Sequence, residues 1–461
     1  MDSEKLYDAI TKVSDGLIDA AGDFCNAGKR KLRKQSIRFA IVSLVTAAAI
    51  LVGIIFWPDS SITPILKAYA IAEAKYPEGP QQGQVSIDYI PLVKTYAADN
   101  IRTFLSGSGT DNKAISPLNI YMALSMLAEI TDGNSRKQLL DVLGCSDMEE
   151  LRSTARSVWY ANYRNDELMT NLLASSLWLN NKIRYNSDTL NTLADTYYAS
   201  SYSGEMGSAE FDATLRNWLN EQTGGLVKDQ ISNISLDPLT TIALVTTVQF
   251  HGKWQSKFAE KATSAQTFHA PNGDIICDFM HASENRTYYW GDNFSAVSLK
   301  FKEGGDMKII LPDEGYTPDD LLADDEVLAF MTNDSFFCKN KKSLMVNMAI
   351  PKFDINSNLD LSNELKALGI TDVFDAGVSD YSPLSDLDTQ YIALSKVLHG
   401  TRVTIDEDGC TAAAYTLLAP PGAAPPPDEQ IDFVVDRPFL FVINYRDNLP
   451  LFAGVVNQPI E

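Results

Sequence analysis

An apolar run near the N-terminus, from Phe39 to Trp57, contains no charged side chain. At ~1.5 Å per residue, a helix of this length spans roughly 28 Å, close to the ~30 Å hydrocarbon core of a bilayer. A basic cluster precedes the run, and Asp59 follows it. Because positive charge stays on the cytoplasmic side, the pattern predicts a single membrane-spanning helix. The N-terminus then lies in the cytoplasm and everything after Pro58 lies outside the cell.

A cleavable signal peptide is the alternative to an anchor. Ala68-Tyr69-Ala70 has the small-x-small pattern of a cleavage site. However, the apolar run is longer than the ~7–15 residues of a signal peptide, and the site lies well beyond its end. We therefore favour an uncleaved anchor.

A second pattern, with the two-residue period of a strand, begins at Cys410, after the acidic and Gly-containing stretch Asp406–Gly409. Residues two apart share one face of a strand. The face that starts at Cys410 is small or apolar throughout, whereas the other face carries the bulky Tyr415. The first face comprises Cys410, Ala412, Ala414, Thr416 and Leu418. A segment of this kind can slide between packed strands, although an Ala-rich linker has a similar composition.

The composition limits the possible partners, and the apolar run divides the chain into four segments. The net charge of −22 favours solubility and argues against nucleic acid as a partner. The five cysteines lack metal-ligand spacing, so no metal site is expected. We predict a cytoplasmic segment at 1–38, a transmembrane helix at 39–57, an extracellular tether at 58–88 and one large domain at 89–461.

The sequence lacks the common catalytic motifs. None of the four histidines lies in an H-E-x-x-H motif, and no serine lies in a G-x-S-x-G turn. A Gly-rich phosphate loop is also absent from the sequence. We therefore expect neither enzymatic activity nor a cofactor.

The stretch Asp406–Ala414 resembles the reactive-loop hinge of the serpins, which read near E-E-G-T-E-A-A-A there. Further stretches similar to serpin motifs follow in the same order from about Pro91 to Pro459. They are Asn112–Ile120, Asn217–Trp218, Leu244–Trp254, Met307–Pro312, Ile350–Phe353, Leu368–Phe374, Asp436–Phe441 and Pro450–Gly454. The resemblance implies an α+β serpin fold with three β-sheets, about nine helices and an exposed reactive centre loop, preceded here by the transmembrane helix.

The resemblance also implies two groups of functional residues. The hinge comprises Glu407, Gly409, Cys410, Thr411, Ala412, Ala413 and Ala414. A structural switch beneath the central sheet comprises Ser116, Asn119, Thr246, Trp254 and His399. The family usually has Asn where Thr246 stands and Ser where Asn119 stands. We therefore hypothesise that Asn119 bonds His399 from the helix side, since an unpaired buried polar group costs ~1–3 kcal/mol.

The reactive bond is predicted between Ala423 and Ala424 by counting from Gly409 with the common serpin spacing. Counting back from Pro438 gives another position, because this loop is about four residues longer than is usual. Small residues on both sides favour elastase-like or subtilisin-like proteases, which have shallow primary pockets. No Arg or Lys lies between Asp408 and Arg437, so trypsin-like proteases are poor candidates.

The resemblance implies a suicide inhibitor. The target serine protease forms an acyl-enzyme with the loop, which then inserts into the central sheet and distorts the protease. The loop departs from the family pattern at Cys410, Thr411, Tyr415 and Pro420-Pro421. They leave two alternatives open: a non-inhibitory, substrate-like serpin, or an inhibitor of papain-like cysteine proteases. We expect a monomer on a bacterial cell surface, anchored by Phe39–Trp57.

Overall fold

The computed structural model describes residues 69–76, 88–165, 169–225, 234–333, 340–385, 392–410 and 429–460. The chain divides into two compact units, Met1–Thr63 and Pro64–Glu461, and the described residues all belong to the second. The predicted cytoplasmic segment and transmembrane helix lie outside the described residues. Within the described ranges, no helix is long and apolar enough to cross a membrane.

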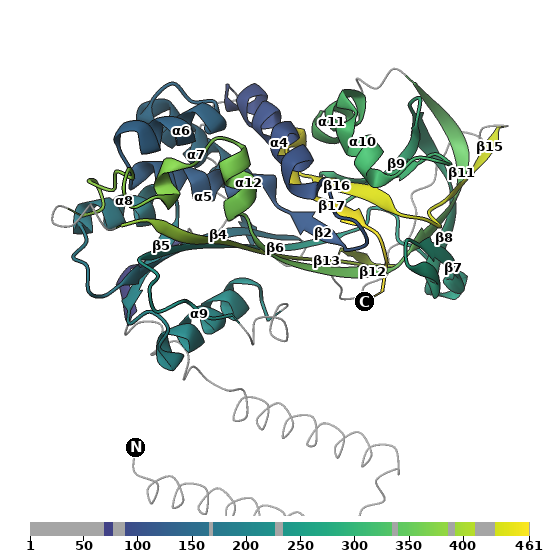
Figure 1. The fold of residues 1–461 in the computed structure, drawn as a ribbon. Helices are drawn as coiled ribbons and strands as arrows, with labels where there is room; N and C mark the ends of the chain where they lie inside the picture. Colours follow the sequence, from purple (N-terminus) through teal and green to yellow (C-terminus); the bar gives the residue numbers. More distant parts are fainter. Residues whose placement is uncertain are drawn as a thin grey trace, which may run out of the picture. The chain divides into compact units, whose positions relative to one another are not determined.

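The first sheet extends across the domain beneath a layer of helices (Figure 1). Its strand order is β1-β5-β4-β6-β14-β13-β12, and β3 pairs with β4 outside this path. The strands are β1 (Ala70–Ala72), β5 (Ala199–Gly204), β4 (Met169–Asn180), β6 (Ile242–Lys253), β14 (Gly409–Cys410), β13 (Leu394–Ile405), β12 (Phe353–Asp360) and β3 (Arg164–Asn165). The two-residue strand β14 therefore lies in the middle of the sheet.

Helices lie on both faces of this sheet, and α5 is the central one (Figure 1). All thirteen residues of α5 are buried, and Pro117 occupies its first turn after the N-cap Ser116. A helix that is buried all round must be apolar on every side, and this one nearly is. The helices near it are α4 (Tyr89–Leu105), α6 (Gly133–Leu143), α7 (Met148–Asn162) and α8 (Ser187–Thr196), while α9 (Ala209–Gln222) covers the opposite face.

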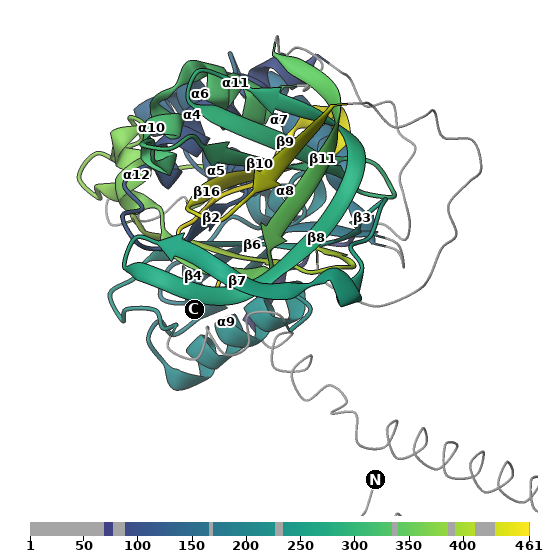
Figure 2. The same cartoon turned by 90° about the vertical axis from the view of Figure 1, so that its right-hand side faces the viewer.

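The second sheet has the order β15-β11-β8-β9-β10-β16-β17-β2, with β7 beside β8 (Figure 2). Its strands are β15 (Gln430–Val434), β11 (Lys341–Pro351), β8 (Gly273–Trp290), β9 (Phe294–Lys300), β10 (Asp306–Pro312), β16 (Phe439–Asn444), β17 (Pro450–Val456), β2 (Lys113–Ile115) and β7 (Ser264–Ala270). The remaining helices are α10 (Pro318–Ala323), α11 (Asp325–Thr332) and α12 (Ser362–Ala367).

The α+β architecture with about nine helices is confirmed, since the described residues contain nine α-helices, α4 to α12. The number of sheets differs from the expected three. The described strands form two hydrogen-bonded sheets, because Tyr288–Trp290 of β8 pairs with Ser295–Val297 of β9. This short pairing joins two groups of strands that would otherwise count as separate sheets.

Part of the segment that we assigned to the tether packs on the domain. Ala70 pairs with Tyr202 of β5, and the backbone N–H of Ala74 donates to Ser200 Oγ at 3.1 Å. The Tyr76 ring stacks on Trp159 of α7 with 6.0 Å between centroids. The compact domain therefore includes residues 69–76, which add the edge strand β1 to the first sheet and pack Tyr76 on α7.

Candidate functional site

The candidate site is the seam between the central strands β6 and β13. These strands pair directly, in parallel, over Ile242–Thr247 and Leu394–Gly400. Beyond this point β14 lies between them. Gly409 and Cys410 pair with Lys253 and Gly252 of β6, and Cys410 also pairs with Ile405 of β13. The seam is thus closed at one end and already holds two residues of the predicted hinge at the other.

His399 holds the closed half of the seam from within. The backbone N–H of Ser116 donates to His399 Nε2 at 2.9 Å, so this nitrogen must carry the lone pair. The other nitrogen, Nδ1, then carries the proton and donates to Thr246 Oγ1 at 2.8 Å. Burial lowers the pKa of His399 to about 3, and the ring is neutral at physiological pH. This neutral ring links helix α5 to strands β6 and β13.

The predicted bond between Asn119 and His399 is wrong. Asn119 is fully buried, but its Nδ2 donates to the carbonyl oxygen of Thr247 at 2.9 Å. The helix-side donor to His399 is the backbone N–H of Ser116, the residue before the first turn of α5. Because that N–H has no partner within the helix, it is free to bond the ring. The Oδ1 atom of Asn119 has no hydrogen-bond partner among the described residues.

A tight turn connects β13 to the hinge strand. The N–H of Asp406 donates to the Gly409 carbonyl at 3.0 Å. In return, Asp406 Oδ1 accepts from the N–H groups of Asp408 at 2.9 Å and Gly409 at 3.1 Å. Asp commonly organises turns in this way. Gly is required at 409 because a Cβ there would lie 2.3 Å from the carbonyl oxygen of Gly252.

Charged contacts hold this turn to the rest of the domain. Glu407 accepts hydrogen bonds from Thr263 Oγ1 at 2.7 Å and from Lys352 Nζ at 2.9 Å. Although partial burial acts to raise the pKa of Glu407, these hydrogen bonds outweigh it and lower the pKa below its ordinary value. Asp408 forms an ion pair with Lys257. The sequence analysis missed these three partners, since no local pattern connects them to the hinge.

Trp254 closes the sheet where the hinge enters. Its indole N–H donates to the Asp406 carbonyl at 3.0 Å, and its backbone N–H donates to the Asp408 carbonyl at 3.0 Å. The ring stacks on Phe301 with 4.8 Å between centroids and is buried. The Cys410 side chain is also buried, which raises the pKa of its thiol. The hinge entrance is therefore a packed surface on which the backbone is fixed.

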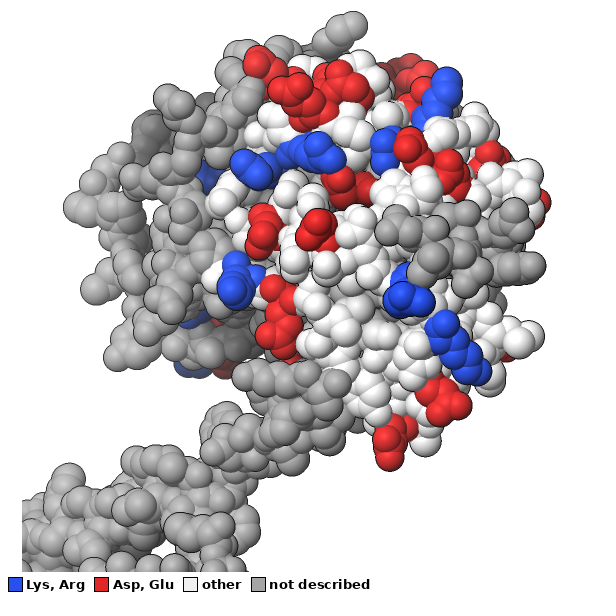
Figure 3. Space-filling view, turned by 90° about the vertical axis from the view of Figure 1, so that its left-hand side faces the viewer, with Lys and Arg blue, Asp and Glu red and all other residues white. Residues whose placement is uncertain are grey.

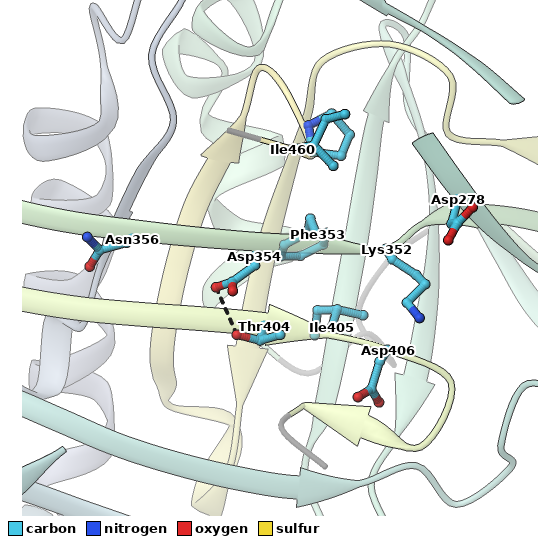
Figure 4. Close-up of a pocket in the computed structure, with 10 residues that line it drawn as sticks. Asp278, Lys352, Phe353, Asp354, Asn356, Thr404, Ile405, Asp406 and Ile460 are labelled. Carbon is cyan, nitrogen blue, oxygen red and sulfur yellow. Dashed lines mark hydrogen bonds between the residues drawn. The ribbon is translucent and has the colours of Figure 1, made fainter. Parts of the chain in front are cut away.

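A cavity of about 570 Å³ opens beside this turn (Figure 4). Lys352 extends along its edge, between Asp278 and Asp406, and Phe353 contributes an apolar wall. Asp354, which also lines the cavity, accepts a hydrogen bond from Thr404 at 2.9 Å and pairs with Arg402. One side of the hinge turn, at Asp406, therefore lines an open cavity.

Other predicted site residues lie outside the described residues. They are the hinge residues Thr411 to Ala414 and the predicted reactive bond between Ala423 and Ala424. The described ranges also contain no group of three or more His, Cys, Asp or Glu side chains that could hold a metal ion.

Comparisons with known proteins agree with this geometry. The family model described as serpin (serine protease inhibitor) matches residues 92–459. Serpin-Z2B of Triticum aestivum is 29% identical over 370 residues, which cover 77% of this chain and 91% of that protein. The leukocyte elastase inhibitor of Equus caballus is 27% identical over 383 residues, covering 79% and 97%.

Solved structures give the same result for the fold. The native state of tengpin, a thermophilic serpin, superposes with a TM-score of 0.72 at 24% identity, covering 84% of this chain and 97% of that chain. The native, stressed conformation of Arabidopsis AtSerpin1 superposes with a TM-score of 0.69, also at 24% identity, covering 81% and 99%. Residues 69–76, with the edge strand β1, precede the part that the family model matches.

Proposed function

We propose, from the premise that this chain belongs to the serpin family, that it traps elastase-like or subtilisin-like serine proteases by insertion of its cleaved loop. The family is described as one of serine protease inhibitors, not of enzymes. The observation that carries the proposal is the parted seam. Gly409 and Cys410 already pair with β6, so the first step of strand addition is present in the uncleaved chain.

The positions of the described residues on either side of the loop support the same mechanism. Cys410 lies in the seam of the first sheet, and the carbonyl oxygen of Glu429 accepts a hydrogen bond from the N–H of Met345 of β11 in the second sheet. A cut in this connection would free the hinge side to continue into the first sheet while β15 stays in the second. Cleavage would therefore permit full insertion of the loop.

The target class rests on the sequence around the reactive bond. Ala423 and Ala424 are small, and the loop contains no Arg or Lys, which favours proteases with shallow primary pockets. The equine relative is named as an inhibitor of leukocyte elastase. We further propose that Phe39–Trp57 anchors the protein in the membrane of a bacterium, with the inhibitory domain outside.

A covalent-complex assay tests the proposed function. Full-length protein is mixed with pancreatic elastase or subtilisin and examined for an SDS-resistant complex. Mass spectrometry of the released fragment is expected to show a new N-terminus at Ala424. A terminus at Asp428 or later would contradict the count from Gly409. Cleavage at Ala423 without any covalent complex would favour the non-inhibitory alternative.

A matched pair of loop variants tests insertion. Ala412→Arg is expected to abolish complex formation while cleavage continues, because an unpaired charge would be buried in the sheet. Ala413→Arg lies on the opposite face and is expected to retain most of the inhibition. Equal loss in both variants would show that the faces are assigned wrongly.

A further inference from the structure

The cavity beside the hinge turn has the size and the lining of a ligand site. Its volume of about 570 Å³ falls within the range of ~300–1,000 Å³ that is usual for small-molecule sites. Phe353 and Ile405, which are both buried, form an apolar part of the lining, and Ile460, which is 49% exposed, also lines it. A ligand with an apolar part would displace water from these side chains.

More negative charge surrounds Lys352 than its ammonium group neutralises. Its Nζ donates to Glu407 at 2.9 Å. This hydrogen bond, together with the negative charges of Glu407, Asp406 and Asp278, raises the pKa of Lys352. Figure 4 shows the lysine side chain extending between Asp278 and Asp406 at one end of the cavity. One ammonium group therefore faces three carboxylates, which leaves an excess of two negative charges at this end.

The other end of the cavity offers a hydrogen-bond acceptor. The Oδ1 atom of Asn356 is buried and has no hydrogen-bond partner among the described residues. Asn356 lies four positions after Lys352 in an extended chain, or ~13 Å along it, and residues two apart share a face. Between them, Asp354 is already paired with Arg402. A ligand that donates a hydrogen bond to Asn356 would satisfy a buried polar group that otherwise costs stability.

The charge excess at the cavity is local. On the face seen in Figure 3, acidic and basic side chains are interspersed, without a large area of one sign. Asp274, which lies on the same strand as Asp278, is paired with His269. The cavity differs from such an acidic surface because it combines unbalanced carboxylates with an apolar wall and a buried acceptor.

We propose that this cavity binds a small organic cation with N–H donors at both ends of a short apolar chain, as in a diamine or an amino-guanidine. One cationic end would contact Asp278 and Asp406, the chain would lie against Phe353, and the other end would donate to Asn356 Oδ1. A guanidinium suits the first end, because its planar fork of donors matches a carboxylate. This site goes beyond the proposed inhibition of proteases and does not depend on it.

A bound cation would connect the hinge turn to the second sheet. Asp406 belongs to the turn before β14, whereas Asp278 belongs to β8. Because the same ligand would hold both carboxylates, binding should restrain the turn. Cys410, which follows the turn and is buried, should then react more slowly with thiol reagents. The cavity would thus give the hinge a chemical input that is separate from the protease.

Equilibrium dialysis of the full-length protein in detergent tests the site, with radiolabelled agmatine as the probe. Agmatine carries a guanidinium and an ammonium group joined by a short methylene chain. We expect saturable binding that butylguanidine, which lacks the ammonium, competes for about tenfold more weakly, since one charge-assisted hydrogen bond is lost. The absence of saturable binding would overturn the proposal. Equal binding of the two cations would overturn the proposed ligand class.

Two substitutions on β8 form a matched pair for the same assay. Asp278→Asn removes one of the unbalanced carboxylates and should weaken agmatine binding about tenfold. Asp274→Asn removes the same charge from the same strand outside the cavity, where the carboxylate is paired with His269, and should leave binding nearly unchanged. Equal weakening in both variants would show that general surface charge attracts the cation, and would overturn the site.

Two substitutions at an exposed position test the location of the ligand. Ile460 is half-exposed, so its replacement should not disturb folding. Ile460→Lys places an ammonium group beside the cavity and should weaken agmatine binding several-fold, whereas Ile460→Leu should retain it. Unchanged binding in the lysine variant would place the cation elsewhere and overturn the proposal.

The connection to the hinge has its own measurement. Saturating agmatine should slow maleimide labelling of Cys410 a few-fold in the wild-type protein, as followed by peptide mass spectrometry. The same concentration should leave labelling unchanged in the Asp278→Asn variant. Unchanged labelling of the wild-type protein under conditions where dialysis shows agmatine bound would overturn the connection to the hinge.

Discussion

The two halves of the β6–β13 seam are held by different kinds of contact. In the closed half, neutral and fully buried groups meet, namely the His399 ring, the Thr246 hydroxyl and the Ser116 N–H. In the hinge half, carboxylates of the turn meet partly exposed lysines, Lys352 and Lys257. Salt and pH weaken exposed ion pairs, whereas buried neutral hydrogen bonds are hardly screened.

Because of this difference, the closed half of the seam contributes more to the stability of the domain, and the hinge half is the part that opens first. In the hinge half, β14 already separates β6 from β13. The ion pairs that hold the turn there are partly exposed and therefore weak. The closed half contains the groups that must lose their partners before more of the loop can enter. We therefore expect substitutions in the closed half to change stability more than substitutions at the turn.

The largest effect is expected for His399→Leu. The substitution leaves the Ser116 N–H and the Thr246 hydroxyl buried without their partner, at a cost of about 3 kcal/mol in the free energy of unfolding. Guanidinium unfolding of the full-length protein measures the loss. His281→Leu is the control. Among the described residues, His281 bonds side chains near the surface, Ser264 and Gln266, so its substitution should cost less than ~1 kcal/mol. Similar losses in both variants would show that the buried bonds of His399 do not determine the size of the effect.

A pH dependence of intermediate size should come from the same ring. Above its ordinary pKa of 6.5, His399 is neutral in the folded and unfolded states. Between pH 6.5 and about 3, only the unfolded state binds the proton, so stability falls as the pH falls. The decrease should be about 1.7 kcal/mol between pH 6.5 and pH 5. The His399→Leu variant should lack this component. An unchanged pH slope in the variant would mean that other groups cause the slope.

The smallest effect is expected for Lys352→Met at the turn. The Lys352–Glu407 pair is partly exposed, so its loss should cost less than ~1 kcal/mol. The substitution should nevertheless loosen the turn and increase maleimide labelling of Cys410 a few-fold, as measured by peptide mass spectrometry. Because hydrogen bonding lowers the pKa of Glu407, the contribution of the pair is present above pH ~4.5 and is lost as the pH falls through the folded pKa. Unchanged labelling at pH 7 would show that the pair does not restrain the hinge.

The sequence predicted the fold because the evidence for it is spread along the chain. Collinear motifs from Pro91 to Pro459 agree with the family match at 92–459. The hydrogen bond from the Ser116 N–H to His399, in place of one from the Asn119 side chain, could not be predicted in the same way. Whether Asn119 or the Ser116 N–H reaches the ring depends on the orientation of one helix turn, and residue types do not encode this orientation.

The features that the sequence analysis missed share a physical cause. β1 has only three residues, Ala70–Ala72, which is too short for a strand period to stand out. Lys352 and Glu407 are 55 positions apart, and neither has a local pattern that points to the other. The link between β8 and β9 rests on three residue pairs. Such contacts are set by tertiary packing, and a linear pattern does not contain them.

The early pairing of Gly409 and Cys410 has a kinetic consequence. When a strand is added to a sheet, the first residue pairs form slowly, because ordering their backbone costs conformational entropy and only a few hydrogen bonds are gained in return. In this protein the backbone of the first two residues is ordered before any cut is made. After cleavage, the first pairs of the new strand are already formed, and only the pairing of the following loop residues remains. The time available to a captured protease for deacylation would then be set by elongation past His399.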